Sequence, residues 1–145
     1  GEAADFIDAY FKQYPKVRQW LDTTIEEGRE HGYVTTLLLR RRYLPELASS
    51  DGATRRAAER AAINMPVQGT AADVIKLAMV RLDAPLREYG AQMLLQVHDE
   101  LVVETPEDSA GEAAALMVEI MEGALDLEVP LKVDVGIGRN WSEIH

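Results

Sequence analysis

The sequence MLLQVHDELVVE occupies residues 93–104 and sets three polar residues, His98, Asp99 and Glu100, between two apolar runs. Each run is short and rich in Leu and Val, which favours a largely buried β-strand over a helix. We therefore predict a hairpin over about residues 92–105, with the polar residues at its exposed bend. Packed flanks would hold the bend within the roughly half an ångström that a metal ligand requires.

Asp99 is the predicted metal ligand at this bend. Side chains alternate along a strand, so Asp99 and Glu100 should point in different directions and should not hold one ion equally. Mg²⁺ takes one or two carboxylates together with waters and substrate phosphate oxygens, so Asp99 alone predicts an incomplete site. The alternative is an ordinary solvated turn, because Asp is common in hairpin turns and short motifs have low specificity.

The length of 145 residues and the 47% content of hydrophobic residues indicate one globular domain with a real core. No apolar run approaches the roughly 18 residues of a membrane span and no signal peptide opens the chain, which favours the cytoplasm and no membrane partner. The chain contains no Cys, and its three His lack zinc-ligand spacing, which argues against disulfides and a zinc enzyme. Because the chain opens Gly-Glu-Ala-Ala without Met, directly into a helical pattern, we expect a fragment of a larger folding unit.

Charge is distributed unevenly along the chain. The net charge is −10, and residues 98–145 hold 12 acids and two bases, so the first 97 residues are neutral overall. Within that neutral part, residues 29–60 hold seven Arg and four acids. A nucleic-acid partner usually requires a basic surface, and this local cluster could supply one in spite of the acidic total.

A polar stripe is predicted next to this cluster. Arg60, Asn64 and Gln68 are spaced by four and would share one helix face if the helix persists through Pro66. Arg can contact phosphates, and amides can donate to the acceptors that every base pair presents in the minor groove. The stripe therefore suits a duplex held without regard to its sequence, although an ordinary exposed helix face explains it as well.

Two further segments precede the stripe. Residues 2–30 show helical spacing interrupted by Pro15, which predicts a break near residues 13–14 and a stop at His31-Gly32. The apolar positions of this segment are expected to be core: Phe6, Ala9, Tyr10, Val17, Leu21 and Ile25. Residues 33–37 and 41–44 are β-prone and predict a second hairpin, which bears Arg40, Arg41 and Arg42 either as phosphate contacts or as a solvated basic strand.

The remaining pattern completes an α+β fold. Helices are predicted over residues 54–64, from 71 to Gly90 and over 106–124, and residues 131–137 alternate well enough for a third strand beside the central hairpin. We expect helices packed on one small antiparallel sheet centred on residues 92–105.

These motifs together resemble the family-A DNA polymerases, the group of bacterial DNA polymerase I. The similarity rests on Gln-Val-His-Asp-Glu at 96–100, Arg-x-x-x-Asn-x-x-x-Gln-Gly-Thr-Ala-Ala-Asp at 60–73, Phe-x-x-Tyr-Pro-x-Val-x-x-Trp at 11–20 and Val-Gly-x-Gly-x-x-Trp at 135–141, and it covers nearly the whole chain. The family also has Tyr-Val-x-Thr-Leu-x-Gly-Arg-Arg, which matches residues 33–41 except that Leu39 replaces the usual Gly. If that Gly has a positive backbone angle, Leu39 would be strained by on the order of 1 kcal/mol and the hairpin could be reshaped.

The resemblance implies a carboxy-terminal segment of a polymerase domain, with fingers-side elements over about 1–90 and palm over about 91–145. It implies that Asp99 holds the catalytic Mg²⁺ ions, that Glu100 supports the site and that His98 lies near the primer end. Arg60, Asn64 and Gln68 would contact primer and template. The implied partners are primer–template DNA, deoxynucleoside triphosphates and the remainder of the polymerase chain, and the family's closing pattern would place His145 near the natural terminus.

The family's other metal-binding Asp and its triphosphate-binding helix have no counterpart in these 145 residues. The chain alone is therefore expected not to extend a primer. Two other interpretations remain open: a non-catalytic duplex-binding module, and a different Mg²⁺-dependent phosphotransferase or nuclease, which would leave the polar stripe unexplained.

Overall fold

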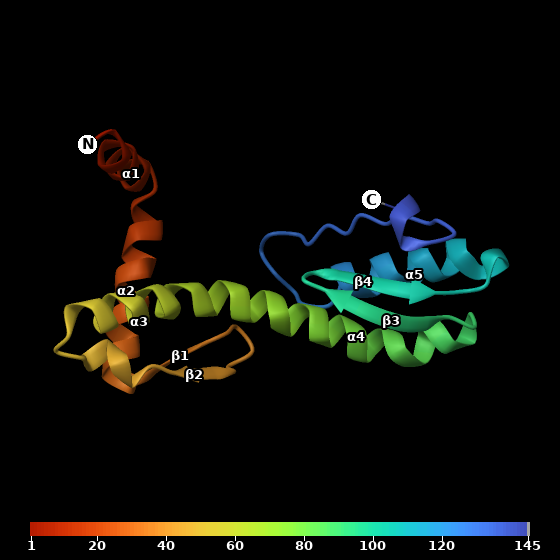
Figure 1. The fold of residues 1–145 in the computed structure, drawn as a ribbon, viewed down its shortest axis with the longest axis horizontal. Helices are drawn as coiled ribbons and strands as arrows, with labels where there is room; N and C mark the ends of the chain where they lie inside the picture. The colour runs from red at the N-terminus through yellow and green to blue at the C-terminus, as the bar shows by residue number, and fades with distance from the viewer. Residues whose placement is uncertain (145) are drawn as a thin grey trace. The chain divides into compact units, whose positions relative to one another are not determined.

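The computed structural model describes residues 1–144, without the side chains of Glu2 and Ala3, and it divides into two compact units, Gly1–Thr70 and Ala71–His145. His145, which the resemblance places near the terminus, lies outside the described residues. The principal elements in chain order are α1 (Glu2–Gln13), α2 (Pro15–His31), β1 (Tyr33–Thr35), β2 (Arg41–Tyr43), α3 (Gly52–Asn64), a π-helical segment (Met65–Gly69), α4 (Thr70–Glu88), β3 (Gln92–Val97), β4 (Glu100–Glu104) and α5 (Ala110–Glu122), drawn as a ribbon in Figure 1.

The first two helices confirm the predicted break. α1 ends at Gln13, and α2 begins at Pro15, where a missing N–H costs nothing because the first N–H groups of a helix have no partner within it. α2 ends at His31, and the capping residue Gly32 adopts φ 76° and donates its N–H to the carbonyl of Gly28. A left-handed residue at this position is the usual helix stop, and Gly adopts it without strain.

The core of the first unit lies where α2, the first hairpin and α3 meet, rather than along α1. Its buried apolar residues are Val34, Leu44, Leu47, Ala58, Ala62 and Met65. The expectation that the stripe of residues 6–25 is core is wrong for Phe6, Tyr10 and Val17, which are 75%, 44% and 37% exposed. Helical spacing marks an apolar face, but burial needs a second surface, and in this unit α2 turns Thr24 and Gly28 inward.

The predicted first hairpin is confirmed. β1 and β2 pair antiparallel in the register Tyr33 to Tyr43, Val34 to Arg42 and Thr35 to Arg41. Leu39 in the turn has φ 63°, so the strain expected from Leu in place of Gly is present. The turn nevertheless closes, with the N–H of Leu39 bonded to the carbonyl of Thr36.

The helical segment that follows begins at a side-chain cap and passes through Pro66 without stopping. The Asp51 carboxylate accepts the N–H of Thr54 at 2.7 Å, and this bond holds the pKa of Asp51 below its usual value. Pro66 lies inside the π-helical segment, so the helices predicted over residues 54–64 and from residue 71 are joined by a widened turn between α3 and α4.

The second unit packs the β3–β4 hairpin against α4 and α5 (Figure 1). Leu82 and Leu86 of α4 and Ala113 of α5 are buried, and Met93, Leu101 and Val103 of the hairpin pack against them. The helix predicted from residue 71 to Gly90 is thus present, and both leucines lie on its buried face.

The hairpin itself is less buried than predicted. Leu94 and Leu95 are each about half exposed. An irregularity in the β3–β4 register falls between Met93 and Leu95, which leaves Leu94 without a partner. A bulge of this kind breaks the alternation of the two faces, so an apolar run no longer implies burial on both sides.

The prediction of a third strand at residues 131–137 is wrong. In the described part of the chain the sheets are the two pairs β1–β2 and β3–β4, and residues 131–137 form no ladder. The N–H of Val133 donates instead to the Glu122 carboxylate at 3.1 Å, and Lys132 lies 3.7 Å from the same carboxylate. An alternating pattern becomes a strand only where a neighbouring strand edge pairs with its backbone groups. Here the Glu122 side chain accepts the Val133 N–H instead. The α+β class with antiparallel pairing stands, but the single three-stranded sheet does not.

A search of the helices within residues 1–144 finds none long and apolar enough to cross a membrane.

We expect Leu39→Gly to raise the free energy of unfolding by about 0.5–1 kcal/mol. Relief of the positive-φ strain should stabilise the folded state by more than the added conformational entropy stabilises the unfolded chain. Chemical denaturation of both proteins measures the difference. Leu38→Gly is the matched control, since Leu38 is also exposed but has no positive φ and should lose stability on substitution. Equal losses for both variants would show that the turn is unstrained.

Candidate functional site

The tip of the β3–β4 hairpin gathers the three residues that the central motif singled out. His98 and Asp99 form a two-residue loop between Val97 and Glu100, which pair across the ladder. His98 adopts φ 54°, and the Gln96 side-chain amide donates to the His98 carbonyl at 3.0 Å. Two-residue hairpin loops require a positive φ, so the ladder and the Gln96 bond together hold His98 in a conformation that few side chains adopt.

The Asp99 carboxylate fits one position of a magnesium site, and no more than one. Asp99 is exposed at the tip and offers oxygen donors, which are the ligands that Mg²⁺ prefers. Within residues 1–144 no group of three or more His, Cys, Asp or Glu side chains is arranged to hold an ion. A further acidic ligand and a substrate phosphate are needed, as the sequence indicated.

The predicted polar stripe lies on the first unit. Arg60 and Asn64 are on α3 and Gln68 is in the π-helical segment, and all three side chains are exposed. The condition on which the stripe depends, a helix that persists through Pro66, is met.

The π-helical turn also improves the alignment of the stripe. Over eight residues of a regular α-helix the direction of the side chain drifts by about 80°. A π turn contains one extra residue, which removes about 100° of that rotation and leaves Gln68 within about 20° of the direction of Arg60. By this geometry Gln68 points nearly in the direction of Arg60, and Asn64, which lies on regular α-helix, points about 40° to one side of Arg60.

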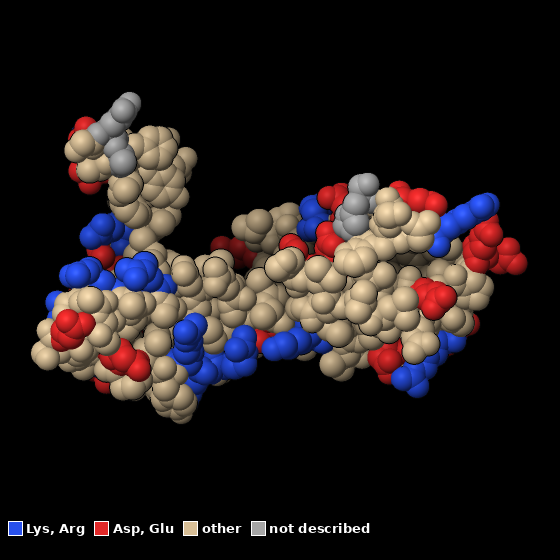
Figure 2. Space-filling view, in the orientation of Figure 1, with Lys and Arg blue, Asp and Glu red and all other residues tan. Residues whose placement is uncertain are grey.

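The three arginines of the first hairpin have different surroundings. The Arg40 guanidinium donates to the carbonyl of Gly69 at 3.0 Å, so this side chain is bonded to the π-helical segment. The Arg41 guanidinium lies 4.4 Å from the centre of the Tyr33 ring, a cation–π distance, and Arg42 is exposed opposite Val34. Figure 2 shows Lys and Arg side chains along α2 and beside this hairpin, and acidic side chains spread over the C-terminal unit.

Sequence reasoning missed the residues that join the first hairpin to the π-helical segment. Thr36 and Thr70 are buried polar side chains, 2% and 8% exposed, and the N–H of Leu37 donates to the Thr70 hydroxyl at 3.0 Å. The signal was present in the sequence, because Gly69 and Thr70 directly follow Gln68, but helical spacing cannot show that a hydroxyl has a distant backbone partner.

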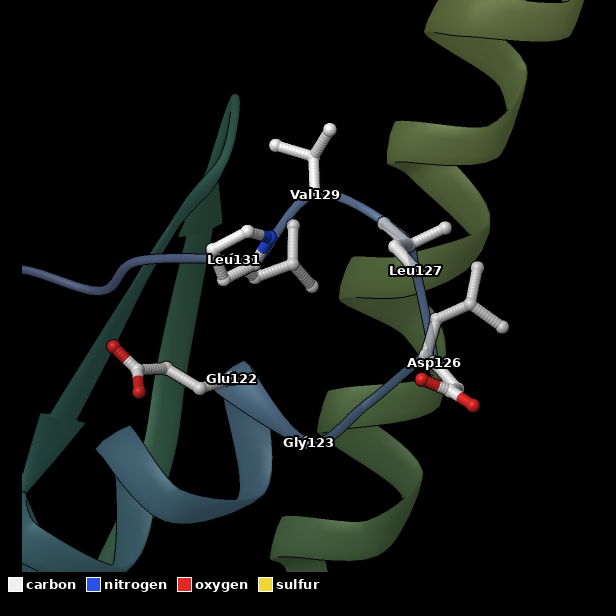
Figure 3. Close-up of a pocket in the computed structure, with 8 residues that line it drawn as sticks. Glu122, Gly123, Asp126, Leu127, Val129 and Leu131 are labelled. Atoms are coloured by element: carbon white, nitrogen blue, oxygen red, sulfur yellow. The ribbon is translucent and has the colours of Figure 1, made fainter.

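A hollow of about 300 Å³ lies in the C-terminal unit. The loop after α5 lines it, and Figure 3 shows the Glu122 and Asp126 carboxylates among Leu127, Val129 and Leu131. No residue of the hairpin tip or of the polar stripe contributes to it, so the hollow does not extend the candidate site.

Comparison with known proteins gives concordant matches. The sequence model of DNA polymerase family A matches residues 1–143. The chain is 61% identical over 142 residues to the thermostable DNA polymerase I of Thermus filiformis and 56% identical over 141 residues to DNA polymerase I of Deinococcus radiodurans. These alignments cover 98% and 97% of the chain but only 17% and 15% of the relatives, so the chain spans less than a fifth of their length.

A solved structure shows the same fold. The POL domain of Pol1 from M. smegmatis, in complex with DNA primer-template and dNTP, superposes with a TM-score of 0.93 at 47% identity. The match covers 99% of this chain and 26% of that one.

Proposed function

The chain belongs to DNA polymerase family A, and from this we propose that it serves template-directed DNA synthesis as one segment of a polymerase. The observation that supports this most directly is the exposed Asp99 on a two-residue tip, in a chain that matches the family over residues 1–143. We assign about residues 1–90 to the fingers side and about 91–145 to the palm. The partners are the remainder of the polymerase, primer–template DNA and deoxynucleoside triphosphates.

In the proposed reaction the primer 3′ hydroxyl attacks the α-phosphate of the triphosphate in line, a new phosphodiester forms and pyrophosphate leaves. Polymerases of this family use Mg²⁺, which when bound neutralises developing charge on the phosphate oxygens and activates the hydroxyl. Asp99 contributes one carboxylate ligand from a tip whose backbone is fixed by the β3–β4 ladder. Glu100 supports the tip, and His98 lies next to the primer end.

The first unit holds the DNA. Arg60 meets the phosphate backbone, while the amides of Asn64 and Gln68 donate to minor-groove acceptors that do not depend on sequence. Arg41 and Arg42 are further phosphate contacts. Arg40, although part of the same basic run, acts mainly within the protein because its guanidinium is bonded to Gly69.

A duplex-binding module without chemistry is the second candidate for the chain taken alone. It is favoured by one contrast: the polar stripe is complete within the described residues, whereas the tip offers Asp99 but no group of three metal-binding side chains.

The first test replaces the matching segment of the Thermus filiformis polymerase with residues 1–143 and compares primer extension by this chimaera and by its Asp99→Asn variant. We expect the chimaera to extend the primer, and the variant to lose about a thousandfold or more in kcat, because the substitution keeps size but removes a metal-binding charge. Asp108→Asn, which removes an exposed charge outside the hairpin, is the control and should retain activity. An inactive chimaera, or an active Asp99→Asn variant, would refute the proposed role.

The second test uses the purified 145-residue chain. We expect no nucleotide incorporation with Mg²⁺ and triphosphates, and duplex binding that weakens steeply with salt as phosphate contacts are lost. Fluorescence anisotropy at several salt concentrations measures the binding. Incorporation that Asp99→Ala abolishes would show that the chain is a complete catalyst.

The third test separates phosphate from base contacts in the chimaera. Arg60→Ala should weaken primer–template binding about tenfold and lower the salt slope by about one, because one phosphate contact disappears. Gln68→Ala should weaken binding by a similar factor and leave the salt slope unchanged, since it removes a neutral hydrogen bond. Arg18→Ala, which removes an exposed guanidinium paired with Asp22, is the control for charge alone. Equal slopes for Arg60→Ala and Gln68→Ala would contradict these assignments.

A further inference from the structure

Two hydrogen bonds join the tip of the first hairpin to the end of the π-helical segment and the first residue of α4. The Thr70 hydroxyl accepts the N–H of Leu37 at 3.0 Å and donates its own proton to the carbonyl of Pro66. The Arg40 guanidinium donates to the carbonyl of Gly69 at 3.0 Å. Residues 36–40 and 66–70, about thirty residues apart in sequence, are thereby joined in one unit.

The contact between these segments is also too close for any residue but Gly at position 69. A Cβ on Gly69 would lie 2.7 Å from Cγ2 of Thr36 and 2.9 Å from Sδ of Met65. Thr36 and Met65 are both buried, so neither can move aside cheaply. The hairpin tip therefore sits directly against the backbone of the π-helical segment.

This contact bears on the polar stripe because a π turn needs support. Pro66 has no N–H to give to a regular helix, and π turns are rare and occur mostly as single widened turns at functional sites. The Thr70 hydroxyl bonds the Pro66 carbonyl on one side and the hairpin backbone on the other. Removal of the Thr70 hydroxyl would therefore break the hydrogen bond that connects the widened turn to the hairpin backbone at Leu37.

We propose that Thr70 is a positioning residue: its hydroxyl fixes the π turn against the hairpin tip and so holds Gln68 on the exposed helix face that also bears Arg60 and Asn64. The inference rests on the proposed function, since it concerns the presentation of Gln68 to the duplex. Thr70 itself touches no DNA in this account, and the hydroxyl acts entirely through the backbone of residues 66–69.

The test compares Thr70→Val with Thr70→Ser in the chimaeric polymerase. Val keeps the shape and loses both hydrogen bonds, whereas Ser keeps both. We expect Thr70→Val to raise the KM for primer–template about tenfold with an unchanged salt slope, and Thr70→Ser to stay within about twofold of wild type. In a double-mutant cycle the effect of Thr70→Val should largely vanish in the Gln68→Ala background, because both changes remove the same contact.

A purely structural role for Thr70 predicts a different pattern. A lower melting temperature with unchanged KM, or an effect that adds in full to that of Gln68→Ala, would overturn the inference and leave the proposed function standing. An unchanged KM for Gln68→Ala itself would overturn the contact at Gln68 and the inference with it, while the Asp99→Asn result would still decide the polymerase assignment.

Wild-type protein gives a second measurement that does not depend on how the variants fold. Amide hydrogen exchange at Leu37 and at residues 67–70 should slow when primer–template is added to the chimaera, because a bound duplex stabilises the turn that the Thr70 hydroxyl fixes. Unchanged exchange at Leu37 on saturation with DNA would contradict the proposal.

Discussion

The hydroxyl of Thr70 is the interaction on which the first unit most depends, because it joins a hairpin and a helix that sequence alone keeps 33 residues apart. One oxygen both accepts the Leu37 N–H and donates to the Pro66 carbonyl. A buried hydroxyl with both roles filled avoids the cost of an unpaired polar group, and here it also stabilises a helical turn that is otherwise rare. The absent side chain at Gly69 lets the two segments approach closely enough for these bonds to form.

The second unit holds its hairpin tip with the β3–β4 ladder and one side-chain bond, from the Gln96 amide to the His98 carbonyl. Its tip must present a carboxylate on a loop of two residues, and such a loop requires a positive φ, which His98 supplies at 54°. Leu39 does the same in the first hairpin. Neither residue type favours that conformation, so in both hairpins the paired strands and local hydrogen bonds must outweigh strain of on the order of 1 kcal/mol. A tip held in this way suits a metal ligand, because the backbone cannot relax when the ion's charge arrives.

Local signals predicted much of this fold, and long-range packing explains what they missed. Pro15 and Gly32 mark the two boundaries of α2, because the effect of each is confined to its own backbone. The buried face of α4 follows from the helical spacing of its apolar residues. The predictions that Phe6 is buried and that residues 131–137 form a strand were wrong. Burial needs a second surface and a strand needs a partner edge, and residue spacing reveals neither. The π turn was hidden for the same reason: Pro66 shows that the regular ladder must fail, but only Thr70 and the hairpin determine that a widened turn replaces it. At the candidate site, residue types led to the predictions for Asp99 and the polar stripe, and they could not show that Arg40 is bonded to Gly69.

The first unit contains the whole polar stripe, whereas the second unit contains one candidate metal ligand, Asp99. The distribution of charge along the chain is compatible with this difference. Residues 98–145 hold all of the net negative charge, which would repel a phosphate backbone unless cations are bound nearby. Under the proposed function, Asp99 therefore acts only together with bound Mg²⁺, whose positive charge would offset the local negative charge and allow a triphosphate to approach. In the same proposal the first unit needs no bound cation, because Arg41, Arg42 and Arg60 are positively charged and the amides of Asn64 and Gln68 are neutral. In this proposal the first unit supplies affinity for the duplex and the second unit supplies a ligand for the catalytic metal ions. A substitution at the π turn can therefore change the strength of DNA binding without changing the charge of Asp99.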